Sequence, residues 1–188
     1  MGARTVVGRR AMLAGGIALA FSRVGTHGQS QDDASSLRPK EGDLLVKVGD
    51  ATLQPLAPAD IPAGAAQTMA WALAPNDRTV RSGSRLNRIL LVRLDPEKLS
   101  PETRARAADG VVAYTAICTH TGCEVIDWQA DEQLLHCPCH YTKFDPKDGA
   151  RVVDGPAPRP LPALPLQVVE GKLAVARPFT TRVGFEPA

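Results

Sequence analysis

Apolar residues in this chain fall into short runs, which are separated by turns rich in glycine, proline and aspartate. Short apolar runs with β-branched residues, bounded by such turns, predict β-strands rather than helices. The chain is therefore expected to be an all-β protein. The expected strands lie at 44–48, 67–73, 89–94, 111–117, 124–128, 133–137, 151–153, 166–169 and 172–176.

The pattern also predicts how some of these strands connect. The run VVAYTAI at 111–117 is apolar throughout, so we expect a strand that is buried on both faces. The runs at 124–128 and 133–137 flank a polar turn and predict a hairpin, and a second hairpin closes the chain at 166–176. Segment 155–165 contains too many prolines for a regular strand ladder.

One segment has the pattern of a helix. Residues 96–109 begin with Pro-Glu, continue with arginine and alanine, and end at Asp109-Gly110, which predicts a helix stop. The fold expected from the pattern is thus a β-protein with one short inserted helix.

The length and net charge of the chain limit the classes of protein to which it can belong. The chain has 188 residues, of which 44% are apolar, which is enough for one domain with a core and a tail. Its net charge is +2, and no basic stripe is interleaved with aromatic residues, so nucleic acid is not expected as a partner.

The N-terminus has the pattern of an export signal. Arg9 and Arg10 precede the apolar run 11–21, as in a charged n-region followed by an h-region, and the pair resembles a twin-arginine signal. The run is too short to cross a bilayer, which takes about 20 residues. Ala18-Leu19-Ala20 is a candidate cleavage site, but retention as a membrane anchor and a merely disordered basic tail stay open as alternatives.

The expected domain plan follows from these boundaries. Residues 1–24 are expected to be the export signal or anchor, the polar stretch 25–42 a flexible linker, and residues 43–182 the folded domain.

Two short loops hold all four cysteines and three of the four histidines: CTHTGC at 118–123 and HCPCHYTKFD at 136–145. Three interpretations compete. Structural zinc would take four of the donors, but the two histidines lie in different loops and lack the finger spacing. Two plain disulfides, common in exported proteins, would leave His120 and His140 without a purpose. A two-iron cluster with one additional disulfide would use all six residues.

The loop pair resembles the Rieske iron–sulfur protein family, in its disulfide-containing branch, with a general likeness over about residues 40–180 and a specific one over 118–145. The resemblance implies an antiparallel β-sandwich with a cluster-binding subdomain at about 116–160 and one [2Fe-2S] cluster per chain. It implies that Cys118 and Cys137 hold one iron, that His120 and His140 hold the other, and that Cys123 and Cys139 form a disulfide.

The resemblance also concerns residues around the ligands. Many quinol-oxidising members carry Gly-Ser-x-Tyr after the second histidine, whereas this chain carries Tyr141-Thr142-Lys143-Phe144. Thr142 keeps a hydroxyl that can bond a cluster sulfide, but Phe144 lacks the hydroxyl that would donate to a cysteine sulfur, which is expected to lower the potential. The segment 155–158 (GPAP) resembles the proline loop that covers the cluster in this family.

The resemblance implies a periplasmic electron-transfer subunit rather than a catalyst alone. The sequence favours a small subunit of the arsenite oxidase type, which relays electrons from a larger molybdenum-containing subunit to a c-type cytochrome. The alternative is the quinol-oxidising Rieske subunit of a cytochrome bc complex, with cytochrome b as partner, and a zinc-binding module without redox activity is more remote. A ring-hydroxylating oxygenase does not fit, because the chain has no room for the mononuclear iron domain. The expected location is the periplasm or the periplasmic face of the inner membrane.

Overall fold

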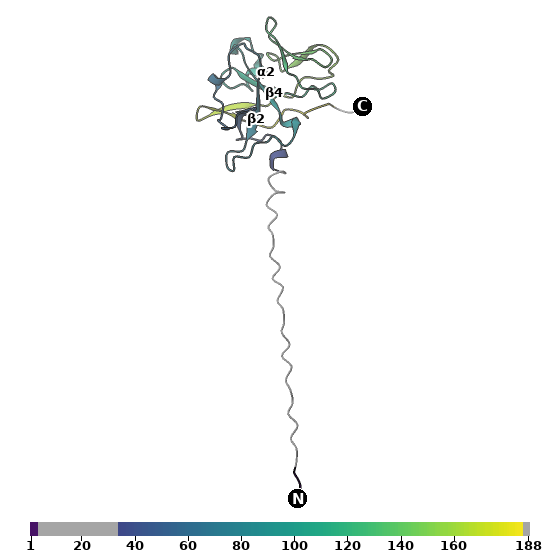
Figure 1. Ribbon diagram of the computed structural model, residues 1–188. Coiled ribbons are helices and arrows are strands. Elements are labelled where there is room, and N and C mark those ends of the chain that lie inside the picture. Colours follow the sequence, from purple (N-terminus) through teal and green to yellow (C-terminus); the bar gives the residue numbers. More distant parts are fainter. Residues whose placement is uncertain (4–33, 186–188) are drawn as a thin grey trace.

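The computed structural model describes residues 1–3 and 34–185, and the body at 34–185 consists of two antiparallel β-sheets (Figure 1). The larger sheet has six strands in the order β4-β3-β2-β1-β10-β9, and the smaller has four in the order β5-β6-β7-β8. The strands are β1 Leu44–Lys47, β2 Thr68–Leu73, β3 Ile89–Arg93, β4 Val111–Thr115, β5 Asp127–Gln129, β6 Leu134–Cys137, β7 Thr142–Asp145, β8 Arg151–Asp154, β9 Leu166–Val169 and β10 Lys172–Val175. The prediction of an all-β protein is confirmed.

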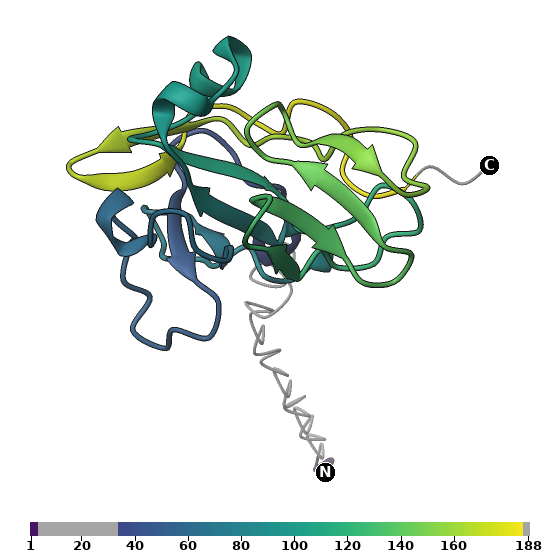
Figure 2. The ribbon, with the colours of Figure 1, turned by 90° about the horizontal axis from the view of Figure 1, so that it is seen from above.

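The larger sheet is covered on both faces. Alternate residues of β3 and β4 enter two different cores, with Leu90 and Tyr114 in one and Ile89 and Ala113 in the other. The first core also contains residues of the smaller sheet, which Figure 2 shows in green beside the larger sheet. This two-sided burial explains why the run at 111–117 is apolar throughout.

Strand β4 lies at the edge of the larger sheet, yet all five of its residues are buried. The proline-rich segment predicted to form no ladder covers this edge. Thr115 N donates to Pro162 O at 3.0 Å and Leu164 N donates to Ala113 O at 2.9 Å. A loop thus satisfies backbone groups that an exposed edge would leave open to pairing with another chain.

The helix predicted at 96–109 is wrong. The segment contains the 3₁₀ helix η3, Pro96–Lys98, and the single-turn helix α2, Pro101–Arg104, joined through extended residues. Ser100 caps α2 through its side chain and Pro101 follows it, so a new helix starts where the expected one would have continued. The predicted stop is real, since Asp109 and Gly110 have φ values of 48° and 79°.

One strand was missed and another is shorter than expected. Strand β7 starts directly after the second cysteine–histidine loop, in a segment with too few apolar residues for a strand prediction. Its alternating burial follows from its position between β6 and β8. The expected strand at 124–128 is limited to β5, because the residues before it still belong to the first loop.

The inserted segment holds the far end of the smaller sheet. Ser100 N donates to Lys147 O at 2.9 Å, and Gly149 N donates to the Thr103 hydroxyl at 2.8 Å. Tyr114 from β4 donates its hydroxyl to Pro146 O at 2.8 Å. The β7–β8 turn is therefore attached to both α2 and the larger sheet.

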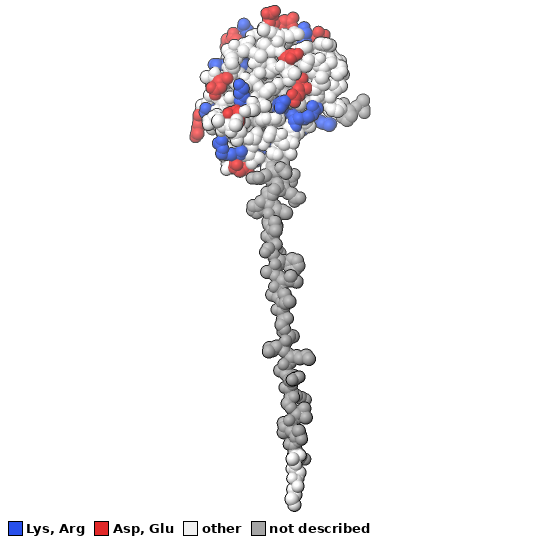
Figure 3. Space-filling view, in the orientation of Figure 1, with Lys and Arg blue, Asp and Glu red and all other residues white. Residues whose placement is uncertain are grey.

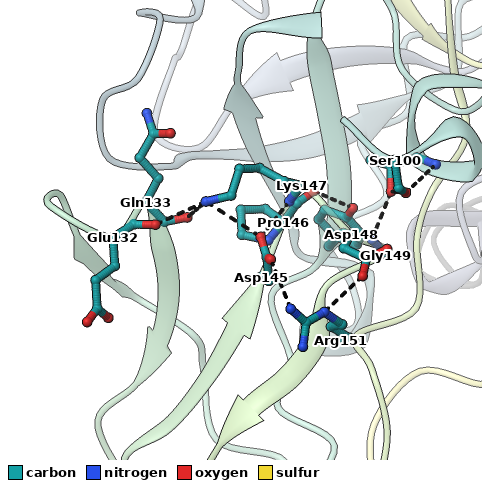
Figure 4. A network of polar contacts seen from close by, with 11 residues as sticks. Ser100, Glu132, Gln133, Asp145, Pro146, Lys147, Asp148, Gly149 and Arg151 are labelled. Carbon is teal, nitrogen blue, oxygen red and sulfur yellow. Dashed lines mark hydrogen bonds and ion pairs between the residues drawn. The ribbon is translucent and has the colours of Figure 1, made fainter. Parts of the chain in front are cut away.

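Figure 4 shows how the same turn is connected to the rest of the smaller sheet. Lys147 Nζ donates to Glu132 O at 3.0 Å, which joins the β5–β6 turn to the β7–β8 turn. Arg151 forms ion pairs with Asp145 and Asp148 across the β7–β8 turn (Figure 4). These contacts stiffen the end of the sheet that lies away from the cysteine–histidine loops.

The expected linker at 25–42 lies partly outside the described residues. Its described part is attached to the body. The Asn87 amide donates to Leu37 O at 2.7 Å, Gly83 N donates to Ser35 O at 3.0 Å, and Arg81 forms a buried ion pair with Asp43. The expected export signal lies outside the described residues apart from 1–3. No helix in the described part of the chain has the length and apolar character needed to cross a bilayer.

The Tyr114 hydroxyl predicts a pH dependence of folding. Burial raises the pKa of Tyr114 above its ordinary value of about 10. The unfolded chain therefore loses this proton first as the pH rises, so stability that is fully present below about pH 10 is lost above it. We expect Tyr114→Phe to cost about 1 kcal/mol at neutral pH, by leaving Pro146 O without its donor, and to weaken the decline above pH 10.

Unfolding followed by circular dichroism at neutral and alkaline pH measures both effects. Tyr141→Phe is the matched control, because Tyr141 is 71% exposed and its loss of a hydroxyl should change stability by less than about 0.5 kcal/mol. An equal alkaline decline in wild type and Tyr114→Phe would refute the explanation.

Candidate metal centre

The two cysteine–histidine loops start at the ends of strands from different sheets. The first, residues 118–123, follows β4 of the larger sheet, and the second, residues 137–141, connects β6 to β7 of the smaller sheet. The first loop is closed on itself, because Cys118 N donates to Cys123 O at 2.7 Å and Gly122 N donates to Cys118 O at 3.1 Å. The second is a tight hairpin turn in which Cys137 and Thr142 are paired in register.

The thiols of Cys118 and Cys137 lie together in the core. Each residue is 1% exposed, neither is in a disulfide, and the two side chains are hydrogen-bond neighbours. Burial, together with the adjacent Cys137, raises the pKa of Cys118 to about 11, although the backbone N–H groups of His120 and Thr121 act in the opposite direction. A metal must therefore displace a tightly held proton, and its positive charge offsets that cost.

The two histidines lie on the more open side. His120 is half-buried and His140 is exposed, and their ring centroids are 4.6 Å apart in an edge-to-face arrangement. Nδ1 of His120 is buried and has no hydrogen-bond partner. A buried polar atom without a partner requires an explanation, and a metal ligand is one that fits an imidazole nitrogen.

A disulfide between Cys123 and Cys139 joins the two loops. This is the pair that the resemblance assigned to a disulfide. The two residues are separated by 16 positions, and in the chain-entropy model a cross-link of this span stabilises the fold by about 3 kcal/mol. It also fixes the position of one loop relative to the other.

Thr142 and Phe144 lie beneath the second loop, and both are completely buried. The Thr142 hydroxyl is another buried polar atom without a partner, as expected for a group that bonds a cluster sulfide. Phe144 lies in the same core as Cys118 and Cys137.

The expected proline loop contacts both cysteine–histidine loops. A Cβ at Gly155 would lie 2.5 Å from Thr142 Cα, so only glycine allows this approach to the second loop. On the other side, the Thr119 hydroxyl donates to Arg159 O at 2.7 Å, which attaches the segment to the first loop. The segment thus lies across the place where the two loops meet.

His136 takes no part in the group. It precedes the buried Cys137 on a strand, so its side chain points to the opposite face, where Nδ1 lies 3.5 Å from an Asp127 oxygen. Its ring stacks on Tyr141 at a centroid distance of 6.0 Å.

Two further contacts with the first loop could not be predicted from the sequence. Arg85, from the 3₁₀ helix η2 (Arg85–Asn87), donates to Gly122 O at 2.7 Å. The ring of Phe185, near the C-terminus, lies 3.0 Å from where a Gly122 Cβ would be. Neither residue belongs to a recognisable motif, and both are far from the loop in sequence.

The donor types match the ligand set of a two-iron cluster. Within residues 1–3 and 34–185 there is no group of three or more His, Cys, Asp or Glu side chains arranged to hold one metal ion. A Rieske [2Fe-2S] centre takes two protein ligands per iron, two cysteines on one and two histidines on the other. The structure brings together two thiols and, beside them, two imidazoles.

Comparison with known proteins identifies the family. Residues 79–165 match the family model of the Rieske [2Fe-2S] domain. The Rieske iron–sulfur subunit of the cytochrome bc1 complex from Streptomyces lividans is 34% identical over 147 residues, which cover 77% of this chain and 85% of that protein. A putative Rieske subunit of a respiratory nitrate reductase from Haloferax mediterranei is 49% identical over 76 residues, covering 40% of this chain and 34% of that protein.

Other relatives are longer, and structural likeness is weaker. The chain covers only 41% of the bc1 Rieske subunit from Streptomyces coelicolor, at 34% identity. The ferredoxin of carbazole 1,9a-dioxygenase from Nocardioides aromaticivorans IC177 is 18% identical, with a TM-score of 0.43 over 71% of this chain and 98% of that one. This score is too low to distinguish between kinds of Rieske protein, but the sequence matches are sufficient: the chain belongs to the Rieske family and binds a [2Fe-2S] cluster.

Proposed function

We propose that this protein is a single-electron relay subunit of a larger oxidoreductase complex. In this proposal Cys118 and Cys137 bind one iron of the cluster and His120 and His140 bind the other. The observation that carries it is the pairing of two buried thiols with two adjacent imidazoles on loops joined by a disulfide. One [2Fe-2S] cluster supplies one-electron redox chemistry, and no other acid–base or nucleophile motif stands out in the sequence.

The ligand types suit a carrier of moderately high potential. Two neutral imidazoles in place of thiolates reduce the negative charge around the cluster, so reduction becomes easier. Rieske centres accordingly lie between about −150 and +300 mV, against about −400 mV for plant-type ferredoxins with four cysteines. The exposed ring of His140 is the natural point of contact for a redox partner.

The surroundings of the ligands favour fast electron exchange. The disulfide, the Arg85 contact and the proline loop all restrict the two loops. Loops held in this way reorganise little when the charge of the cluster changes. A relay benefits directly, because it must pass through both oxidation states in each turnover.

Two kinds of complex are candidates. We favour a periplasmic relay between a molybdenum-containing subunit and a c-type cytochrome. The HYTKFD sequence that follows Cys139 resembles that type, and the related Haloferax protein is named a nitrate reductase subunit. The second candidate is a quinol-oxidising subunit of a cytochrome bc complex. The long alignments with Streptomyces bc1 subunits favour it.

The proposed location is the periplasm or the periplasmic face of the inner membrane, reached through the twin-arginine-like segment at 1–24. A disulfide next to the cluster suits an oxidising compartment. The proposed domain runs from 43 to 182, with the cluster-binding part at about 116–160. The described contacts of Ala34 and Leu37 with Arg81 and Asn87 support a docked segment ahead of this domain.

Purification of the native complex tests the choice between the two candidates. We expect the protein to co-purify with a molybdenum-containing subunit, identified by mass spectrometry and metal analysis. Co-purification with cytochrome b would instead support the bc-type candidate, and purification with neither would contradict a subunit role.

The ligand assignment predicts a sharp contrast between neighbouring histidines. His120→Ala should abolish the visible absorption and the reduced-state EPR signal of the Rieske centre, together with the bound iron and acid-labile sulfide. His136→Ala is the matched control and should keep all of them, because the His136 ring faces Asp127. An intact spectrum in His120→Ala would overturn the assignment.

The buried Phe144 predicts a change in redox potential. Phe144→Tyr places a hydroxyl within the core that holds both cysteines, where it can donate to a sulfur and stabilise the more negative, reduced state. We therefore expect a higher midpoint potential in an EPR-monitored redox titration. Phe179→Tyr, a partly buried site in the other core, should leave the potential unchanged. A midpoint for Phe144→Tyr that stays equal or falls would show that no such bond forms.

A further inference from the structure

The described body has a surplus of arginines without acidic partners. Of the twelve arginines in residues 34–185, five form ion pairs with carboxylates: Arg81, Arg88, Arg104, Arg106 and Arg151. The other seven do not. Two of these seven, Arg85 and Arg159, contact the first cysteine–histidine loop, and two more line a groove next to the C-terminal segment that Arg159 binds. We call these four the arginine patch: Arg38, Arg85, Arg159 and Arg182.

Two members of the arginine patch lie on either side of His120. Arg85 donates to the carbonyl of Gly122, two residues after this histidine. The carbonyl of Arg159 accepts the hydroxyl of Thr119, the residue before it. The guanidinium of Arg85 therefore lies beside the loop that supplies one of the proposed ligands, whereas Arg159 contacts this loop through its backbone carbonyl.

The C-terminal segment extends the arginine patch. Arg159 donates from Nη2 to Gly184 O at 2.6 Å, which attaches the end of the described chain to the proline loop. Arg182 and Arg38 line a groove of about 240 Å³ together with Phe179 and Val183. Figure 3 shows lysine and arginine side chains gathered on the drawn face near the C-terminal end of the described body.

Most segments around the arginine patch lack acidic residues, and the two acidic residues in the groove beside Arg159, Glu102 and Asp148, are ion-paired with Arg106 and Arg151. Residues 34–39, 81–88, 118–123, 155–160 and 176–185 contain no aspartate or glutamate. The nearby Glu124 is already paired with Arg88 at 2.7 Å. No ion pair within the described residues joins the arginine patch to a carboxylate.

We propose that the arginine patch docks an acidic face of the redox protein that exchanges electrons with the cluster. This proposal rests on the relay function proposed above and adds the charge of its partner. Unpaired charges beside an electron-exchange site raise the rate of encounter with oppositely charged partners, and they orient the encounter. Arginine and exposed aromatic residues, here Phe185 at 43% exposure, are also enriched in protein–protein interfaces.

An acidic protein explains this arrangement better than an anionic lipid surface does. A membrane would attract basic residues on any exposed face, whereas the Arg85 side chain and the Arg159 backbone bind the loop of His120 itself. The test below separates the two.

Stopped-flow oxidation of the reduced, full-length protein provides the main test. Ferricyanide, a trianion, takes one electron from the cluster and becomes ferrocyanide, and tris(1,10-phenanthroline)cobalt(III), a trication, takes one electron in the same way. We expect the ferricyanide rate constant to fall with added salt, and Arg182→Gln to lower it by about twofold or more at low salt. The cobalt rate constant should stay equal or rise. Poly-L-glutamate should slow ferricyanide oxidation of wild type more than that of Arg182→Gln.

Arg93→Gln is the matched control. It removes the same charge from an arginine that also has no carboxylate partner, but Arg93 pairs with Val111 at the end of β4 opposite to the cysteine–histidine loops. Arg182 makes no hydrogen bond within the described part of the chain, so its replacement should not disturb folding, and an unchanged EPR signal checks this. Equal effects of Arg182→Gln and Arg93→Gln, or no effect of Arg182→Gln, would overturn the proposal.

Two further outcomes separate the docking proposal from its alternatives. Binding to phosphatidylglycerol vesicles that depends on Arg182, without any effect of poly-L-glutamate on oxidation, would refute the acidic protein partner and indicate a lipid surface. A reduced cluster that reacts with neither oxidant would contradict the relay function itself, whereas equal, salt-independent rates with both oxidants would contradict only the docking proposal.

Discussion

The metal centre depends on one constraint: two loops from different sheets must meet and stay together. Neither loop alone offers more than one free thiol, so the pair of buried sulfurs exists only at their junction. The disulfide holds the junction from the outer side, and the proline loop attaches to both loops from another side. The sheets behind them are in turn fixed by the β7–β8 turn, which the inserted segment and Tyr114 hold at the opposite end. The rigidity of the site thus rests on contacts at both ends of the smaller sheet.

The site has two sides with different functions: the sulfurs are buried, and the histidine side is exposed. Cys118 and Cys137 lie in a core where burial raises the pKa of the Cys118 thiol, so in the proposed assignment the charge of the iron would stabilise its thiolate. His140 is exposed and faces His120, which leaves an edge of the site open to a partner. An electron carrier needs this combination, because the buried side shields the cluster from water while the exposed side stays within reach of a redox partner.

The two loops that meet in the structure were easier to recognise in the sequence than the details of the fold, for a physical reason. All six cysteines and histidines lie within two short segments, so their spacing and residue types can be recognised in the sequence without knowledge of the surrounding fold. The helix at 96–109 failed because Ser100 and Pro101 start a new helix inside a pattern that looked continuous. Strand β7 was missed because its extended conformation is imposed by β6 and β8 rather than by its own residues. Arg85 and Phe185 were missed since their contact with Gly122 joins distant segments without a motif.

Segments far from the first loop in sequence both support this loop and contribute to the surface that a partner would recognise. Arg85 and Arg159 each serve the first loop through hydrogen bonds, yet their charges remain unpaired by any carboxylate of the described body. An ion pair such as that of Arg88 with Glu124 would have held the loop equally well and hidden the charge. Arg85 donates to a backbone carbonyl instead, which leaves its positive charge exposed beside the His120 loop. The Arg85 side chain that helps to keep the loop still therefore also gives its surface a positive charge, which a partner approaching the cluster would meet.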